Sequence, residues 1–210
     1  MEHHGHSQLP TSGRALTAVA VAATLHCLTG CAIGEVAGMA IGTALGLSNW
    51  ATVALAVALA FVFGYALTSL PLLRAGLAPS AVVPIVLASD TFSIAVMEVI
   101  DNLVMLVVPG AMEAGLDSLL FWGALSFALS LAFVVAVPVN RWLIARGRGH
   151  AAVHRTGVHG GPSPRAVGAA LAVAFVFGTA VLVAEALDTD AQEPAHGEEH
   201  AALVAVAPKS

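Results

Sequence analysis

Apolar residues fill long unbroken runs of the chain, and short groups of turn-forming residues separate these runs. Ser48-Asn49 is one such separator and Pro109-Gly110 is another. A membrane helix needs roughly 20 mainly apolar residues, and each run is long enough to provide them. The runs are continuous rather than alternating, so they predict helices and not the strands of a membrane barrel. The predicted spans are 15–47, 50–73, 81–108, 116–139 and 165–187.

Composition supports the assignment of these runs to a lipid environment. Hydrophobic residues make up 58% of the chain and charged residues only 10%, with a mean hydropathy of +0.88. A soluble globular protein is about half apolar but about a quarter charged. The missing charge excludes a largely water-exposed surface. We therefore expect an all-α integral membrane bundle of about five helices, with the lipid bilayer as its main partner.

The distribution of Lys and Arg predicts how the helices are oriented. Arg14 precedes the first run and Arg74 lies in the second link, whereas the links after the first and third runs contain no Lys or Arg. The positive-inside rule then places the N-terminus inside and the C-terminus outside a bacterial inner membrane. These positions explain the basic residues without a nucleic-acid surface. The fourth link contains most of them: Arg141, Arg146, Arg148, Arg155 and Arg165.

The same pattern divides the chain into predicted segments. Histidines concentrate in the tails and the fourth link, where they either gather metal or belong to solvated disorder. The segments are a His-containing cytoplasmic tail (1–14), a four-helix membrane core (15–145), a basic cytoplasmic loop (146–164), a fifth membrane helix (165–187) and an acidic outer tail expected to be disordered (188–210).

The beginning of the first run also has features of a bacterial lipoprotein signal. A short basic region and an apolar stretch precede the sequence Leu28-Thr29-Gly30-Cys31. Apolar sequence continues well past Cys31, however, and no polar tether follows it. We therefore expect this run to be retained as a membrane helix.

Small residues recur along the first run at the spacing of one helix face. Glycine occupies every fourth position, which makes a flat groove that another helix can approach closely. We expect this row to pack against another helix, with a partner membrane helix or a second copy of the chain as candidates. The predicted packing residues are Gly30, Gly34, Gly38 and Gly42.

A second row on the first run carries side chains that are unusual in lipid. Cys27, Cys31, Glu35 and Met39 also recur at fourfold spacing, so at 100° per residue they share one broad face. His26 projects to roughly the opposite side from Glu35. It either serves a different neighbour, such as a backbone carbonyl, or the helix bends near Gly30.

The third run carries a polar stripe at a matching depth. Glu35 and Asp101 each lie roughly 30 Å from the start of their own helix at about 1.5 Å per residue. The fourth run offers only Ser126 and Ser130 in its middle, so we expect any site to be built from the first and third runs. The stripe comprises Asp90, Met97, Glu98, Asp101, Asn102 and Met105.

These acids have no counter-charge in the middle of any span. An intramembrane acid costs about 2.5 to 3.5 kcal/mol on insertion scales, so it must be protonated or hold a cation. Thiol, thioether, imidazole and carboxylate ligands together favour copper(I) or zinc over sodium or magnesium. The candidate metal ligands are Cys27, Cys31, Glu35, Met39, Glu98 and Asp101. The candidates for a proton relay or gate are His26, Asp90 and Asn102.

Two segments carry a resemblance to a known family. HCLTGCAIGEVAGMAIG (26–42) and SDTFSIAVMEVIDNLVML (89–106) resemble the prokaryotic membrane family described as domain of unknown function 4396. The resemblance covers about residues 16–145. It implies a multi-pass membrane fold and a pairing of the two segments, and it implies no activity.

Two functional hypotheses follow from these patterns. The first is a cation-handling membrane protein, with a transition-metal or proton site between the first and third helices and a role in transport or metal handling. The alternative is a structural or assembly subunit whose glycine row docks a partner helix, without an ion site. An enzyme is not expected, because no nucleophile is paired with a base and Cys27 and Cys31 have three residues between them rather than the two of the usual redox motif.

Overall fold

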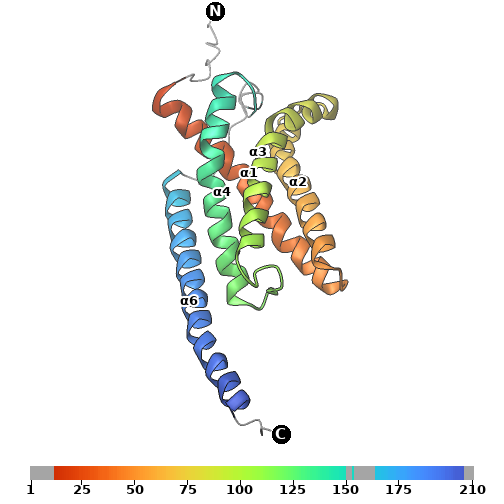
Figure 1. Ribbon diagram of the computed structural model, residues 1–210. Helices are drawn as coiled ribbons and strands as arrows, with labels where there is room; N and C mark the ends of the chain where they lie inside the picture. Colours follow the sequence, from red (N-terminus) through yellow and green to blue (C-terminus); the bar gives the residue numbers. More distant parts are fainter. Residues whose placement is uncertain (1–11, 150–152, 154–163, 206–210) are drawn as a thin grey trace, which may run out of the picture.

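The computed structural model describes residues 12–149, 153 and 164–205, and all regular elements in this part of the chain are helices (Figure 1). All five helices are long and apolar enough to cross a membrane, the last through its segment Gly168–Asp188. The predicted all-α, multi-pass architecture is therefore confirmed. The helices are α1 (Gly13–Ala44), α2 (Asn49–Arg74), α3 (Pro79–Val107), α4 (Leu119–Ala145) and α6 (Pro164–Ala205).

The boundaries of α1 and α4 differ clearly from the predicted spans. α1 ends at Ala44 rather than at residue 47, and Gly46 follows with a positive φ of 63°. α4 begins at Leu119 and continues through Pro138 to Ala145, whereas the predicted span was 116–139. A proline removes only one backbone hydrogen bond, and neighbouring helices make this tolerable in a membrane. The extension brings Asn140 into the helix.

α6 also extends beyond its predicted end. It continues past residue 187 to Ala205, into the segment predicted to be a disordered tail. Alanine and glutamate are strong helix formers and are frequent there, which favours this continuation. The predicted N-terminal tail up to residue 11 and most of the basic loop (150–152 and 154–163) lie outside the described residues.

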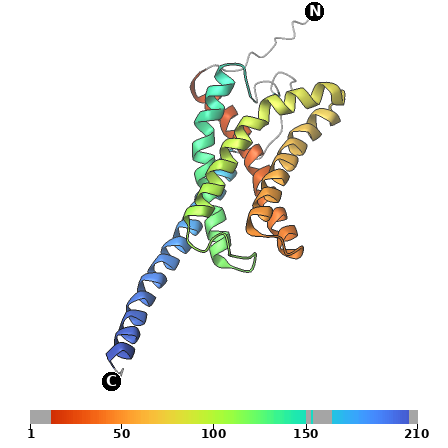
Figure 2. The same ribbon diagram turned by 45° about the vertical axis from the view of Figure 1, so that its right-hand side comes forward.

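The first four helices form the bundle, and α6 runs along α4 (Figures 1 and 2). α1 packs most extensively against α2 and α4, while α3 contacts all three of these helices. Close approach of α4 and α6 depends on glycine, since a Cβ atom on Gly178 would lie 2.7 Å from the carbonyl oxygen of Gly123. The rings of Phe127 and Phe175 stack across the same interface at 5.6 Å.

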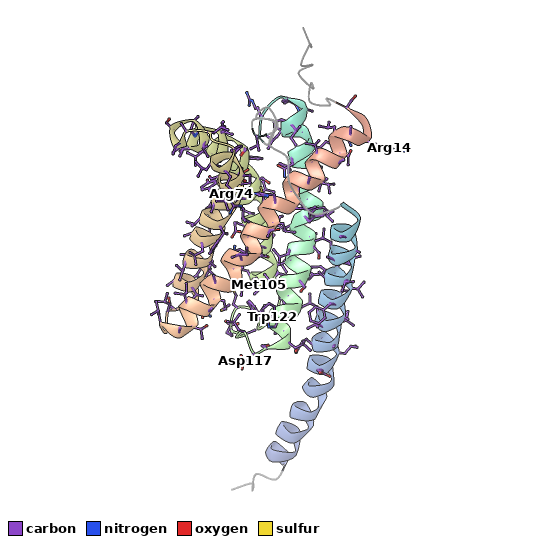
Figure 3. The ribbon with its side chains drawn as sticks, turned by 180° about the vertical axis from the view of Figure 1, so that it is seen from behind. Arg14, Arg74, Met105, Asp117 and Trp122 are labelled. Atoms are coloured by element: carbon purple, nitrogen blue, oxygen red, sulfur yellow. The ribbon has the colours of Figure 1, made fainter. Side chains whose placement is uncertain are left out.

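The outer surface is suited to a bilayer with aromatic residues near its boundaries. Trp50, Trp122 and Trp142 are exposed near helix ends, where membrane proteins concentrate amphipathic rings. The guanidinium carbon of Arg146 lies 4.1 Å from the Trp142 ring centroid. Figure 3 shows Arg14 and Arg74 toward one end of the molecule and Trp122 and Asp117 toward the other.

The four predicted packing glycines of α1 lie directly against α2. A Cβ atom on Gly30 would lie 2.6 Å from the backbone of Gly64, and one on Gly34 would overlap the backbone of Ala60. This row is therefore filled within the chain and is not free for a partner helix or a second copy, which corrects that part of the sequence-based expectation. The α2 residues that meet Gly30, Gly34, Gly38 and Gly42 are, in this order, Gly64, Ala60, Ala56 and Thr52.

Candidate functional site

Three carboxyl side chains from two helices meet in the core of the bundle. Glu35 of α1 interacts directly with both Glu98 and Asp101 of α3. Glu98 and Asp101 are only 5% and 2% exposed, and Glu35 is partly buried. We call these three residues the carboxyl cluster. The structure thus brings together the acids that the sequence placed at similar depths.

The carboxyl cluster lacks the donors that normally accompany buried acids. One oxygen of Glu35 and both oxygens of Glu98 and of Asp101 are buried, and no amide, hydroxyl or basic group among the described residues donates a hydrogen bond to them. The middle of each span contains no Lys or Arg. Carboxyl oxygens therefore face one another. Ionised carboxylates cannot remain buried in this arrangement, so the cluster requires a proton or a cation between its oxygens.

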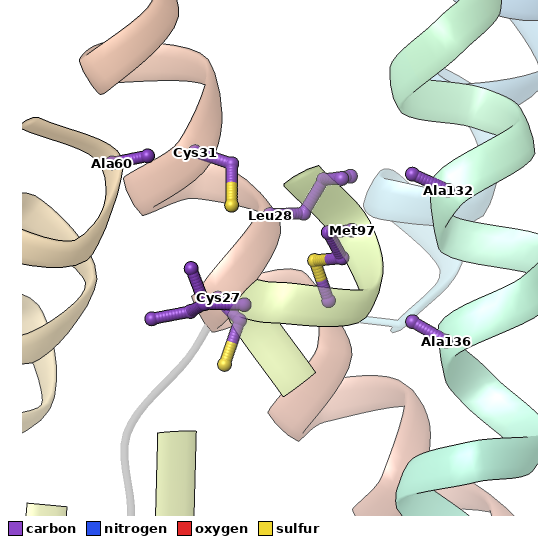
Figure 4. Packing of buried hydrophobic residues seen from close by; sticks show 8 residues of the cluster. Cys27, Leu28, Cys31, Ala60, Met97, Ala132 and Ala136 are labelled. Atoms are coloured by element: carbon purple, nitrogen blue, oxygen red, sulfur yellow. The ribbon is translucent and has the colours of Figure 1, made fainter. Parts of the chain in front are cut away.

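The two cysteines divide between different neighbours. Cys31 lies beside Glu98 of the carboxyl cluster, whereas Cys27, one turn earlier, interacts with Ser93 and lies near Asp90. Both cysteines are buried, neither forms a disulfide, and they lie next to Met97 of α3 (Figure 4). The cysteines therefore form a link along α1 rather than a pair that faces one common partner.

The six predicted metal ligands do not converge on one point. Within the described part of the chain, no group of three or more His, Cys, Asp and Glu side chains is arranged to hold a metal ion. Cys27 lies near Asp90, and Cys31 lies beside Glu98 of the carboxyl cluster. Met39 lines a cavity that also contains Glu35. The six residues therefore do not form a single metal site.

A buried hydrogen-bond network connects three helices close to Cys27. Asn140 Nδ2 donates to Thr24 Oγ1 at 2.8 Å and to Ser93 Oγ at 2.9 Å. Thr24 Oγ1 in turn donates to the Ala20 carbonyl oxygen at 2.8 Å. We call Thr24, Ser93 and Asn140 the amide–hydroxyl network. Because Asn140 lies on α4, the expectation that polar sites use only the first and third helices is wrong here.

Replacing Asn140 with alanine is expected to lower the stability of the bundle. The change removes two interhelical hydrogen bonds, each worth about 0.6 kcal/mol on average in membranes, so we expect a loss of about 1 kcal/mol or more. Thermal unfolding in a mild detergent measures the effect. Ser130→Ala is the matched control, because Ser130 Oγ donates only to Ser126 O within its own helix. An equal melting temperature for both variants would contradict a structural role of the network.

The three predicted relay residues have separate environments. Asp90 accepts a hydrogen bond from Ser89 Oγ at 2.7 Å and interacts with Thr68 of α2. Asn102 Nδ2 donates to the Glu98 carbonyl oxygen at 2.9 Å. His26 hydrogen-bonds to the backbone of Leu67 on α2. His26 therefore belongs to the α1–α2 contact, which agrees with the first of its two predicted alternatives, a different neighbour from Glu35.

A cavity connects the carboxyl cluster to one end of the bundle. Its volume is about 200 Å³, and Glu35 and Asn102 line its inner part. Leu47 and Asn49, at the turn between α1 and α2, and Gly115, in the loop between α3 and α4, line its outer part. The cavity thus offers a route from the bundle end to Glu35.

Sequence reasoning missed several of these polar positions. Thr24 and Ser93 are common residues in membrane helices and gave no separate signal. Asn140 lies just beyond the predicted end of the fourth span at residue 139, whereas α4 continues to Ala145. The apolar stretch Trp142-Leu143-Ile144-Ala145 that follows Asn140 and Arg141 indicates that the helix continues, and this signal could have found Asn140.

Comparison with known proteins identifies the family of the chain. No curated protein and no solved structure matches it. Residues 18–149, which are more than half of the chain and include the carboxyl cluster and the amide–hydroxyl network, match the family described as a domain of unknown function (DUF4396). The chain therefore belongs to the DUF4396 family.

Proposed function

We propose that this protein takes up and releases protons at the carboxyl cluster, as part of cation transport across a bacterial inner membrane. The observation that carries the proposal is the meeting of Glu35, Glu98 and Asp101 without a basic residue or an ordinary hydrogen-bond donor. Buried intramembrane acids are costly and commonly mark ion pathways and proton relays. A helix pair that served packing alone would not need three of them.

A cavity on one side of the cluster and a series of buried thiol and carboxyl groups on the other support a transport role. On one side, the cavity extends from Glu35 to the end of the bundle. On the other side, Cys31 lies beside Glu98, and the two cysteines interact with each other. Cys27 then leads to Asp90, which is a fourth buried carboxyl. Groups that can carry a proton therefore continue from the cluster in one direction, and the cavity opens in the other.

Proton movement into proteoliposomes tests the proposal. Purified protein is reconstituted with a pH-sensitive dye inside the vesicles, and a proton gradient is imposed with potassium and valinomycin setting the membrane potential. We expect a dye response above that of protein-free vesicles, either alone or when a monovalent or divalent metal cation is supplied on the opposite side. A response equal to that of empty vesicles under all these conditions would contradict the proposal.

The same proposal includes an orientation that fusion proteins can check. Arg14 and Arg74 lie toward one end of the molecule, as the positive-inside rule requires for the cytoplasmic end (Figure 3). We expect alkaline phosphatase fused after residue 210 to be active in the periplasm. The same enzyme fused after Arg148 is expected to be inactive. The opposite pattern would reverse the orientation and place the cavity on the cytoplasmic side.

The structural-subunit alternative is weakened by the contacts of the glycine row. That alternative uses Gly30, Gly34, Gly38 and Gly42 to dock a partner, and α2 of the same chain lies against them. An assembly role would need a different surface. In that role the acids would serve only as hydrogen bonds between α1 and α3, which glutamine could form equally well.

A further inference from the structure

Methionines gather around the cavity that leads to the carboxyl cluster. Met39 of α1, Met105 of α3 and Met112 of the following loop all line it, and the whole chain contains five methionines. The same three belong to one packed cluster with Phe121 and Leu125 of α4. Three thioethers from three separate segments thus share one space of about 200 Å³. Figure 3 shows Met105 close to the loop end of the bundle.

The charged residues that line this cavity are all acidic. Glu35 lies at its inner part, and Glu113, from the loop between α3 and α4, also lines it. No Lys, Arg or His is among the described residues of the lining. One oxygen of Glu35 and both oxygens of Asp101 are buried without an amide, hydroxyl or basic donor among the described residues. Asp101 is 2% exposed and interacts with Glu35. The cavity is therefore suited to a cation.

The ligand chemistry narrows the kind of cation. A thioether is an uncharged, polarisable ligand that favours soft ions such as copper(I), whereas sodium and magnesium ions prefer oxygen ligands. A monovalent ion needs only one carboxylate for charge balance, and Glu35 can supply it. Burying an ion with neutral ligands and one counter-charge avoids a net charge in the membrane.

We propose that this cavity, which we call the thioether cavity, binds a soft monovalent cation, copper(I) or silver(I), through the sulfur atoms of Met39, Met105 and Met112. Glu35 balances the charge of the bound ion and connects the thioether cavity to the carboxyl cluster. Copper(I) or silver(I) would then be the cation that is transported, and this role rests on the proposed function. Binding by the three thioethers does not itself depend on proton exchange.

Methionine can also serve only to fill space, and leucine separates this possibility from ligation. A methionine-to-leucine change nearly conserves volume and usually costs less than about 1.5 kcal/mol, so the variant is expected to fold. It removes the sulfur atom and thereby the ligand. Met97→Leu is the matched control, because Met97 is buried beside the cysteines and does not line the cavity.

X-ray absorption at the copper edge tests the proposal on selenomethionine-labelled protein. The background carries Cys27→Ala and Cys31→Ala, so that thiols cannot bind the metal. Copper(I) is added under anaerobic conditions with bicinchoninate as a competing chelator. We expect copper–selenium scattering in this background and in its Met97→Leu version. The Met39→Leu/Met105→Leu/Met112→Leu version is expected to lose this scattering and the corresponding copper, while its elution in size-exclusion chromatography stays unchanged.

The outcomes also separate this inference from the proposed function. Copper bound without selenium neighbours, or selenium scattering that persists in the triple leucine variant, would overturn the thioether cavity as a metal site. Proton flux that depends on Glu98 in the absence of copper–selenium scattering would leave the proposed function standing alone. If copper–selenium scattering is present but Glu98→Gln does not change proton flux, the metal site would be supported. The proposed link between metal binding and proton exchange would be contradicted.

Discussion

Replacing Glu98 with glutamine is expected to lower proton flux into proteoliposomes by about 100-fold, the lower end of what a positioned proton-transfer group contributes. Glutamine keeps the size and the hydrogen-bonding capacity of the side chain but cannot carry the proton. Glu98 is 5% exposed and interacts with both Glu35 and Cys31, so it lies between the cavity side of the cluster and the cysteines. Asp101→Asn is expected to have a similar effect.

An acid elsewhere on the protein provides the control for this prediction. Glu185 is exposed on α6, away from the carboxyl cluster, and Glu185→Gln is expected to leave the flux unchanged. The decisive comparison is the double variant Glu35→Gln/Glu98→Gln. Full flux in that variant would favour a structural role, because glutamines preserve the contacts between α1 and α3 while removing two of the protons.

Replacing Gly34 with leucine is expected to prevent stable packing of the bundle. A Cβ atom at this position would overlap the backbone of Ala60, and a backbone cannot rotate away as a side chain can. Overpacking of a core usually lowers the free energy of unfolding by about 1 to 3 kcal/mol. We expect a clash with a helix backbone to cost about 3 kcal/mol or more. We expect loss of the monodisperse peak in size-exclusion chromatography and a lower melting temperature.

The matched control for Gly34 is an exposed small residue on the same helix. Ala22 of α1 is exposed, so Ala22→Leu adds a comparable apolar group toward lipid and should be tolerated. If both variants elute and melt alike, α1 and α2 are not in the close contact described here. The orientation of the glycine row would then have to be different.

The helices could be predicted from the sequence because the membrane imposes their length and composition. Each apolar run had to be long enough to span, and glycine or proline marked most of the ends. The end of α4 was missed because Asn140 and Arg141 interrupt the apolar run, whereas the helix continues through them to Ala145. A basic side chain is tolerated near the end of a membrane helix, because it can reach the membrane–water interface.

The carboxyl cluster was accessible to sequence reasoning because periodicity places Glu98 and Asp101 on one face of α3. Depth then matched them with Glu35 on α1. The sequence could not predict that Cys27 and Cys31 have different neighbours, because the residue that each thiol contacts depends on where α3 crosses α1. Helical projection gives the face of a residue but not its neighbour.

The remaining features depend on tertiary arrangement. The glycine row predicted close packing, but its spacing does not distinguish α2 of the same chain from a partner helix. Met112 lies in a loop, where no periodicity relates it to Met39 or Met105. The thioether cavity exists only because the α3–α4 loop lies next to the ends of α1 and α2.

Infrared difference spectroscopy of the carboxyl groups tests the central claim most directly. Spectra of the reconstituted protein are recorded between acidic and alkaline pH, in H2O and in D2O, for the wild type and for Glu98→Gln. We predict a protonated-carboxyl C=O band that titrates, shifts in D2O and is lost or displaced in the variant. A wild-type spectrum identical to that of Glu98→Gln throughout this region would contradict proton exchange at the carboxyl cluster.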